Sequence, residues 1–359
     1  MHKNLKDIAN LITEYLQNND FYSNVELDFL REAVKDYPLR GGKRLRPALL
    51  IWCAKIFDEN FDINKLIPAA TAVEIYHNWT LVHDDIIDND DVRRNKKSCH
   101  KLLTDYAKEK RPLHPDRSER FGLEFAILTG DVQQAWAINE ILNLTTKHNI
   151  DANLTITIAQ RLNEFVNCKL ISGEGFDVDF SYQNWTDIKT EQIIHMNYLK
   201  TAVLLQFAAE TGAALAINTN DFENNENIKL ISEFVYCAGI AFQYRDDWLG
   251  IFGDFKKLGK PICSDLSENK PTVLLSTALK NSSNEMRTRL LELSGQNSYT
   301  PQEIIEIQEI VRDSGAEKYL NDEMNNLKLR AENILKKLPQ NQYNNILREC
   351  LKYFIKREL

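Results

Sequence analysis

The sequence predicts an all-α fold, and two observations lead to this prediction. Almost every long segment of the 359-residue chain places apolar residues three and four positions apart, which is the spacing of one face of a helix. No run alternates apolar and polar residues for any length with the period of two that a half-buried strand shows. Several segments are apolar on most of their surface, as helices inside a bundle are, so we expect a helical bundle.

The same spacing places each helix in order along the chain. Up to residue 217 it predicts helices at Leu5–Gln17, Val25–Lys35, Leu45–Phe57, Leu66–Asp88, Phe121–Thr145, Asn153–Gly173 and Asp187–Ile217. After that it predicts helices at Glu226–Ile251, Pro271–Leu279, Glu285–Leu293, Pro301–Asp313, Ala316–Leu338 and from Gln342 to the C-terminus. The polar stretch Asp105–Arg120 has the composition of a surface loop, and Gly253–Pro271 is a second helix-breaking region.

Composition favours one globular domain over residues 1–359. Apolar residues make up 43% of the chain and charged residues 27%, close to the globular average, which argues against disorder and against a membrane protein. The 52 acidic and 44 basic side chains give a formal net charge of −8, which would repel nucleic acid. We therefore expect no nucleic-acid partner.

The compartment is expected to be the cytoplasm. The six cysteines are scattered without a CxxC pair, as reduced and mostly buried thiols are. The N-terminal segment carries acids and helix periodicity, so we expect no secretory signal. The longest apolar stretch, Ala202–Ile217, is interrupted by polar residues and is too short for a transmembrane segment.

Two clusters of aspartates interrupt apolar helical stretches. Asp84, Asp85 and Asp88 lie in LVHDDIIDNDD, and Asp246 and Asp247 lie in IAFQYRDDWLGIFGD. The general interpretation of a DDxxD run is a solvated helix face, but such a face would here also expose the large apolar residues around each cluster. Two clusters of this kind in one chain favour functional carboxylates.

The spacing of the first cluster suits a metal ion. Positions four apart lie on one face of a helix, with about 5 to 6 Å between their side chains, so Asp84 and Asp88 can hold one ion or two adjacent ions. Paired oxygen ligands suit Mg²⁺, which keeps several waters and completes its shell with phosphate oxygens of a substrate. These residues predict a Mg²⁺-dependent enzyme that acts on diphosphates.

Such an enzyme also needs cations to bind polyphosphate. The segment GGKRLRP, residues 41–47, places three cations on a turn that leads into a helix, where backbone N–H groups add to anion binding. Arg93 and Arg94 follow Asp88 by five and six residues. Each group alone is also explained by a solvated loop or a charged helix end. Three lysines are uninformative when taken singly: Lys200, Lys260 and Lys270.

The order of the motifs is more informative than any one of them. GGKRLRP is followed by His77, DDIID, the RR pair, YLKT at residues 198–201, FQYRDD and LGK. In this order they resemble the motifs of the trans-isoprenyl diphosphate synthase (polyprenyl synthetase) family, over about residues 39–270. The resemblance implies a short-chain type, such as a geranylgeranyl or farnesyl diphosphate synthase, with one all-helical domain around a deep apolar cavity, and a homodimer.

The resemblance also implies roles for the matching residues. Asp84 and Asp88 would coordinate two Mg²⁺ ions on the allylic diphosphate with support from Asp85, and Asp246 would hold a third ion. The residues expected to bind isopentenyl diphosphate are Lys43, Arg46, His77 and Arg94. Those expected to clamp the allylic diphosphate are Arg93, Lys200 and Lys260, and Lys270 is expected to bind substrate as well. The remaining catalytic candidates are Thr201 and Gln243, which would face the carbocation, and Asp247.

The reaction implied by the resemblance is a condensation of isopentenyl diphosphate with dimethylallyl, geranyl or farnesyl diphosphate. The allylic C–O bond breaks as the charge of the leaving diphosphate is stabilised, the double bond of isopentenyl diphosphate attacks, and the released diphosphate takes a proton. An apolar cavity suits this chemistry because water would quench the cation. Two alternatives stay open: a class I terpene cyclase, which needs no second diphosphate site, and a non-catalytic subunit of a prenyl synthase.

The chain departs from the family pattern at three positions. Gly250 stands where many members have a third Asp in the second motif, and Asp254 is a candidate outer partner for the ion. Asn95 stands where Gly is common, and Glu174 stands where Gln is frequent. None of these departures removes a primary ligand.

The resemblance implies that product length depends on the residues one turn before the first aspartate motif, which here are Trp79 and Thr80. Four positions turn a helix by about 40° past a full circle and five by about 140°, so Thr80 points more directly toward the channel than Trp79 does. A large ring beside a small threonine predicts a short product, and we favour geranylgeranyl over farnesyl diphosphate. Trp79 is also explained as ordinary core.

Overall fold

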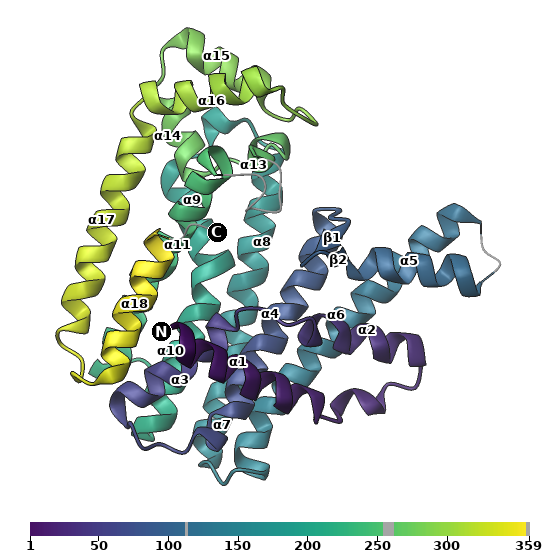
Figure 1. The fold of residues 1–359 in the computed structure, drawn as a ribbon, viewed down its shortest axis with the longest axis vertical. Coiled ribbons are helices and arrows are strands. Elements are labelled where there is room, and N and C mark those ends of the chain that lie inside the picture. The colour runs from purple at the N-terminus through teal and green to yellow at the C-terminus, as the bar shows by residue number, and fades with distance from the viewer. Residues whose placement is uncertain (112–113, 254–261, 357–359) are drawn as a thin grey trace. The chain divides into compact units, whose positions relative to one another are not determined.

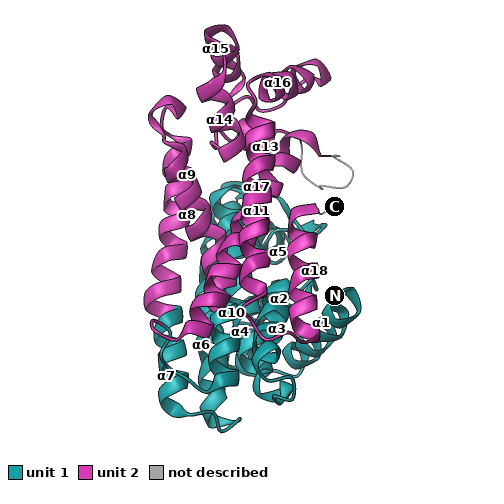
Figure 2. Ribbon diagram, turned by 90° about the vertical axis from the view of Figure 1, so that its left-hand side faces the viewer, with its two compact units in different colours: residues 1–162, 208–222 teal, residues 163–207, 223–359 magenta. Residues whose placement is uncertain are grey.

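The all-α prediction is confirmed by the computed structural model, which describes residues 1–111, 114–253 and 262–356. Within these ranges the chain forms helices joined by short connections, and its one sheet is a hairpin with two residues in each strand (Figure 1). The chain divides into two compact units, which Figure 2 colours separately. The prediction of a single domain stays a prediction.

The first unit comprises Met1–Leu162 and Ala208–Phe222. Its helices are α1 (His2–Gln17), α2 (Asp28–Leu39), α3 (Leu45–Phe57), α4 (Ile67–Ile87), α5 (Cys99–Lys110), α6 (Pro115–Thr146) and α7 (Ala152–Gln160). Two 3₁₀ turns, η1 (Phe21–Asn24) and η2 (Ile63–Lys65), and the strands β1 (Val92–Arg93) and β2 (Lys96–Lys97) complete it. Helix α4 is buried on nearly all sides, as its apolar composition predicts.

The second unit comprises Asn163–Phe207 and Glu223–Leu359. Its helices are α8 (Cys168–Ser181), α9 (Thr190–Asn197), α11 (Glu226–Phe252), α13 (Ser264–Ser267), α14 (Val273–Asn281), α15 (Asn284–Leu293), α16 (Pro301–Asp313), α17 (Ala316–Leu335) and α18 (Gln342–Lys356), with a 3₁₀ turn, η4 (Trp185–Asp187). Residues from α8 to α17 form one apolar cluster, which is the core of this unit.

Two predicted long helices contain π-helical turns. The helix predicted at Asn153–Gly173 is α7 followed by the π turn η3 (Arg161–Asn167) and the start of α8. The helix predicted at Asp187–Ile217 is α9, the π turn η5 (Tyr198–Ala202) and α10 (Val203–Ile217). Apolar spacing continues through both turns, so the sequence pattern does not reveal them. Such turns are frequent at functional sites, and η5 contains two predicted site residues.

The prediction of a loop at Asp105–Arg120 is wrong. Its first part belongs to α5 and its last part to α6, and residues 112 and 113 lie outside the described ranges. The helix is compatible with the sequence because Lys, Glu, Ala and Arg are good helix formers. Pro115 is the first residue of α6, where its missing N–H is not needed.

Other expectations concern burial and the membrane. All six cysteines are free thiols, and all except Cys168 are buried. Within the described ranges, every helix is too short or too polar to cross a membrane.

Candidate functional site

The first aspartate cluster lies where α4 ends. The backbone N–H of Asp88 donates to the carbonyl of Asp84 at 2.8 Å, so the two residues are one helical turn apart, as their spacing predicts. Both side chains are half-buried, in contrast to the apolar residues that fill the preceding turns. The last turn of α4 therefore presents two carboxylates at the end of a buried helix.

Asp85 is completely buried and has a different environment from its neighbour. Tyr37 donates a hydrogen bond to Asp85 Oδ2, and Arg93 donates from Nε to Oδ1 at 2.6 Å. The hydroxyl of Tyr37 in turn accepts from the backbone N–H of Cys99 at 3.0 Å. Burial raises the pKa of Asp85, although the bonds from Arg93 and Tyr37 oppose this shift. Asp85 thus anchors Arg93.

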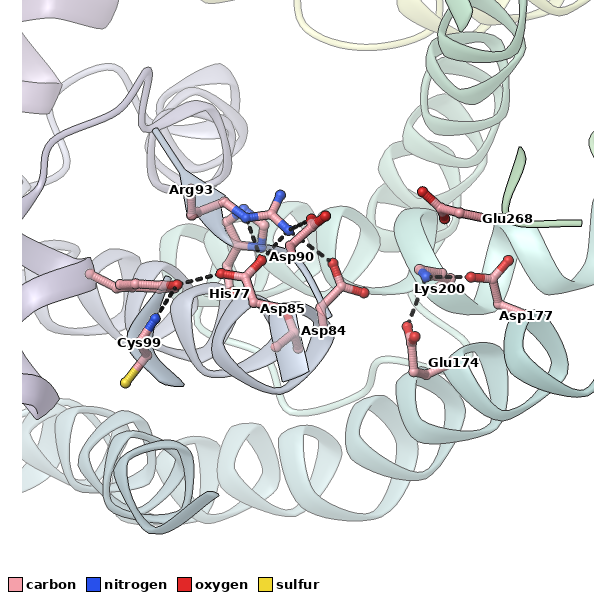
Figure 3. Close-up of polar contacts among 12 residues, drawn as sticks. His77, Asp84, Asp85, Asp90, Arg93, Cys99, Glu174, Asp177, Lys200 and Glu268 are labelled. Atoms are coloured by element: carbon pink, nitrogen blue, oxygen red, sulfur yellow. Dashed lines mark hydrogen bonds and ion pairs between the residues drawn. The ribbon is translucent and has the colours of Figure 1, made fainter. Parts of the chain in front are cut away.

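Arg93 connects the carboxylates at the end of α4. Its Nη2 lies 3.5 Å from Asp84 Oδ2 and 3.1 Å from Asp90 Oδ2, and it also pairs with Asp85 (Figure 3). The guanidinium therefore offsets negative charge beside Asp84. A phosphate group at this position would meet both a cation and the carboxylates predicted to bind a metal.

The RR pair lies in a hairpin. Residues Arg94 and Asn95 form the turn between β1 and β2, with φ values of 54° and 59°. Two successive positive φ values are typical of a type I′ turn, which favours Asn or Gly. Asn95 therefore meets the same backbone requirement as the Gly that is common in the family.

Arg40, directly after α2, is a site residue that the sequence did not predict. Its guanidinium donates to the carbonyl of Arg93 at 3.1 Å and to the carbonyl of Lys97 at 2.7 Å, so it ties both strands to α2. It also lies 4.3 Å from the ring centroid of Tyr37. The stacked pair Tyr37 and Arg40 carries no motif, and its partners are about fifty residues away, so sequence spacing could not reveal it.

The three cations of the GGKRLRP turn differ in burial and in hydrogen-bond partners. Arg44 has a φ of 51° and a fully buried side chain that pairs with Glu74 and donates to the carbonyl of Pro38. Lys43 is exposed, and Arg46 is half-buried with its Nε enclosed and without a hydrogen-bond partner among the described residues. Arg44 is therefore structural, whereas the other two cations remain candidates for anion binding.

Arginines crowd around His77 on α4. Burial lowers the pKa of His77 well below its ordinary value, and Arg46 and Arg94 add to the shift, so its imidazole is neutral. Burial also lowers the pKa of Arg46 to about 10; Glu74 opposes this shift and Arg94 adds to it. A buried guanidinium whose Nε has no partner among the described residues is stabilised by an anion, so the group has the chemistry of a phosphate site.

Arg94 reaches this group because Gly42 leaves room for it. A Cβ atom at Gly42 would lie 3.3 Å from Arg94 Cζ, and the φ of Gly42 is 137°, which side chains rarely adopt. Arg94 also donates to the carbonyl of Gly41. The glycine pair thus fits the approach of Arg94 as well as the turn itself.

In the second unit, Lys200 lies in the π turn η5 between two carboxylates. Its Nζ is 2.7 Å from Asp177 Oδ2 and 2.9 Å from Glu174 Oε2 (Figure 3). Lys270 shares Asp177, with 3.4 Å between its Nζ and Oδ2. Burial acts to raise the pKa of Asp177, but the two lysines outweigh it and the pKa is lowered. The lysines are therefore held in place by acids.

Thr201, Gln243 and Asp247 form a chain of hydrogen bonds. Thr201 donates to Gln243 Oε1 at 3.2 Å, and Gln243 Nε2 donates to Asp247 Oδ1 at 3.2 Å. The other oxygen of Asp247 accepts from the backbone N–H of Val273 at 3.1 Å, at the start of α14. Burial, followed by the charge of Asp265, raises the pKa of Asp247 to about 8. Asp247 therefore fixes Gln243 and α14.

Asp246 is half-buried beside this chain. One turn further, Gly250 accepts a backbone hydrogen bond from Cys263 at 2.8 Å, and a Cβ atom built on it would lie 3.5 Å from Asp265 Oδ2. The position that lacks the third Asp of the family pattern thus has a carboxylate from α13 nearby. Lys260 and Asp254 lie outside the described residues.

The two product-length candidates differ in burial. Trp79 is 6% exposed and packs against Tyr76 with 4.7 Å between ring centroids. Its indole N–H is buried and has no hydrogen-bond partner among the described residues. Thr80 is half-buried, and its hydroxyl donates to the carbonyl of His77 at 2.8 Å. The roles of both residues stay predictions.

The donor set suits a metal ion that uses substrate oxygens. Across the described ranges, no three His, Cys, Asp or Glu side chains gather closely enough to enclose a metal ion by themselves. Mg²⁺ is commonly held by one or two carboxylates together with waters and substrate phosphates, so Asp84 and Asp88 fit this ion without a complete protein cage. A metal bound here would depend on the diphosphate.

Comparison with known proteins gives consistent results. A family model described as polyprenyl synthetase matches residues 28–311. The chain is 34% identical to a short chain isoprenyl diphosphate synthase of Methanocaldococcus jannaschii, covering 80% of this chain and 77% of the relative. It is 33% identical to a geranylgeranyl diphosphate synthase of Saccharolobus solfataricus, covering 85% and 84%. The crystal structure of a geranylgeranyl pyrophosphate synthetase from Pyrococcus horikoshii matches 99% of both chains, with a TM-score of 0.82 and 26% identity.

Proposed function

The chain belongs to the polyprenyl synthetase family, and from this premise we propose that it condenses isopentenyl diphosphate with an allylic diphosphate in a Mg²⁺-dependent reaction. The observation that carries the proposal is on α4, where arginines lie around His77 and the carboxylates of Asp84 and Asp88 follow about two and three turns later. One helix thus combines an anion site with a metal site, as a two-diphosphate reaction requires.

The proposed site for isopentenyl diphosphate is the arginine group. Arg46 and Arg94 would each donate to phosphate oxygens, and a bound diphosphate would relieve their repulsion. Neutral His77 can donate one N–H as well. Lys43, exposed on the preceding turn, would add a fourth contact.

The proposed site for the allylic diphosphate uses Asp84, Asp88 and Arg93, and in the second unit Asp246. These aspartates would hold three Mg²⁺ ions, which when bound stabilise the negative charge that develops on the diphosphate as the C–O bond breaks. Arg93 would contact the same diphosphate from the hairpin.

Residues of the second unit would complete the chemistry. Lys200 and Lys270 would bind diphosphate oxygens, and we extend this role to Lys260 from sequence alone. Thr201 and Gln243 would present oxygens to the allylic cation, and Asp247 would hold Gln243 in place. We infer that the released diphosphate takes the proton from the adduct, so no side-chain base is needed.

For the product we propose geranylgeranyl diphosphate in preference to farnesyl diphosphate. Trp79 is large and rigidly packed, and its buried N–H is costly to keep, which supports selection for its size. The relative from Saccharolobus solfataricus is named a geranylgeranyl diphosphate synthase. A ring at this position would stop growth of the chain after few additions.

We also propose a homodimer in the cytoplasm. Four large apolar side chains are exposed along α6, within an arc of about 140° that the exposed acids Glu124 and Asp131 share; the four are Leu123, Ile127, Leu128 and Leu142. Such a stripe is typical of a protein interface. Free cysteines fit a reducing compartment.

One assay tests the proposed function. Purified protein with Mg²⁺ and radiolabelled isopentenyl diphosphate is incubated with dimethylallyl, geranyl or farnesyl diphosphate, and the products are separated by chain length. We expect incorporation that stops on addition of a chelator. Release of a hydrocarbon from the allylic substrate alone would instead indicate a terpene cyclase. No incorporation with any primer would contradict elongation and favour a non-catalytic subunit.

A further inference from the structure

Tyr37 and Arg40, at the end of α2, hold the residues around Arg93 in place. Tyr37 is 2% exposed, and its hydroxyl joins Asp85 to the backbone of Cys99. Tyr37 occupies Oδ2 of Asp85, while Arg93 Nε occupies Oδ1. With each oxygen engaged, the carboxylate cannot rotate without breaking a hydrogen bond, so it holds Arg93 in one orientation.

Arg40 supports the backbone of the same hairpin. It donates to one carbonyl on each strand, that of Arg93 on β1 and that of Lys97 on β2. Asp36 accepts its Nε at 2.9 Å, and the ring of Tyr37 lies beneath its guanidinium. Its side chain is 2% exposed, although the bond to the carbonyl of Lys97 lies at the surface.

Together these contacts fix the orientation in which the Arg93 guanidinium meets a ligand. Its Nε is directed to Asp85, and its Nη2 lies toward Asp84 and Asp90. A long arginine side chain loses rotamer freedom when it binds, and a guanidinium that is already oriented loses less. Preorganisation of this kind improves binding without any new contact to the ligand.

We propose that Tyr37 and Arg40 are positioning residues for the allylic diphosphate, acting through Asp85 and the β1–β2 hairpin to orient Arg93. Neither residue is expected to touch the substrate. This inference rests on the proposed function. It also explains why Asp85, the middle aspartate of the first cluster, is buried: its carboxylate holds the guanidinium of Arg93.

The chain offers a matched control for Tyr37. Tyr15 donates to Glu140 Oε2 at 2.7 Å in the same unit, so Tyr15→Phe removes a comparable phenol–carboxylate bond that is not connected to Arg93. We expect Tyr37→Phe to raise KM for the allylic substrate about five-fold, the effect of one hydrogen bond of ~1 kcal/mol. KM for isopentenyl diphosphate should change less than about two-fold, and Tyr15→Phe should leave both constants within the same range.

A second variant tests the hairpin without turnover. Arg40→Met keeps an unbranched apolar side chain and removes the guanidinium donors, so we expect faster amide hydrogen exchange across residues 92–97 in the substrate-free protein, and no such change in Tyr15→Phe. If wild-type protein does not elongate any primer, the proposed function fails while the exchange result still decides whether Arg40 orders the hairpin. If wild-type protein is active and Tyr37→Phe matches Tyr15→Phe in both Michaelis constants, the inference is overturned. Unchanged hairpin exchange in Arg40→Met would overturn it as well.

Discussion

At the scale of single residues, adjacent positions of one motif have opposite environments. Asp84 is half-buried at the end of α4, whereas Asp85 is enclosed by Tyr37 and Arg93. Two consecutive aspartates look alike in the sequence, and helix spacing separates them only once the buried face is known. Substitutions of Asp84 and Asp85 should therefore have different effects on the enzyme.

Asp84→Ala should lower turnover by about two orders of magnitude or more, because it removes a proposed Mg²⁺ ligand on the leaving diphosphate. The measurement is kcat for incorporation of labelled isopentenyl diphosphate at saturating Mg²⁺. Asp7→Ala is the control, since Asp7 is exposed on α1 and has no proposed role. Near-normal turnover of Asp84→Ala would show that the aspartate assignment is wrong.

Trp79→Ala should lengthen the product if the indole limits growth of the chain. Loss of a buried aromatic ring also costs about 3–5 kcal/mol of folding stability, so the variant is assayed well below its Tm. The measurement is product chain length with farnesyl diphosphate as primer. An unchanged product length would show that Trp79 is a residue of the structural core and does not limit growth of the chain.

The GGKRLRP turn shows where prediction from residues ended. Sequence order assigned Lys43 and Arg46 to a diphosphate, and the structure leaves both as candidates. The order of the motifs could not show that Arg44, between these two residues, is buried against Glu74. The inward direction of the Arg44 side chain follows from a positive φ at the start of α3. Tyr37 and Arg40 were missed for a similar reason, since their contacts are made across the fold.

At the scale of elements, most helices were predictable, whereas α5 and the short irregular features were not. A stripe of apolar residues over several turns identifies α1 or α16, because burial of one face requires that spacing. The two-residue strands β1 and β2 are too short to show any period. They matter nonetheless, because their turn sets the position of Arg93 and Arg94.

The hairpin turn should accept Gly and reject Val at position 95. Asn95 has a φ of 59°, which Gly adopts freely and a β-branched residue does not. Asn95→Gly should keep KM for the allylic substrate close to the wild-type value, and Asn95→Val should raise it several-fold. Equal constants for the two variants would mean that the turn geometry does not affect binding.

Close helix packing should make one glycine sensitive and another tolerant. A Cβ atom at Gly212 on α10 would lie 2.0 Å from the carbonyl oxygen of Leu50 on α3, so Gly212→Ala should destabilise the protein by about 1–3 kcal/mol. Gly175 on α8 has no atom within 4 Å of such a position, and Gly175→Ala should stabilise its helix by about 0.5–1 kcal/mol. Chemical denaturation measures both. A stable Gly212→Ala variant would contradict the close approach of α10 and α3.

At the scale of the whole molecule, family membership and fold agree, while assembly depends on surface residues. Composition and motif order predicted an all-α enzyme of the polyprenyl synthetase family, and the comparisons confirm it. Motif order, however, describes buried and catalytic positions and says nothing about the exposed face of α6. That face became visible only when the structure showed which of its apolar residues are not covered.

The homodimer can be tested on α6 with a matched control elsewhere. Ile127 is 47% exposed in the middle of the apolar stripe, and Leu329 is 58% exposed on α17. If two copies pack through α6, a charge at position 127 would be buried without a partner, which is strongly unfavourable. Ile127→Glu should therefore sediment as a monomer at concentrations where the wild-type protein and Leu329→Glu are dimers. A dimer that persists in Ile127→Glu would place the interface on another surface, and a monomeric wild-type protein would exclude the homodimer altogether.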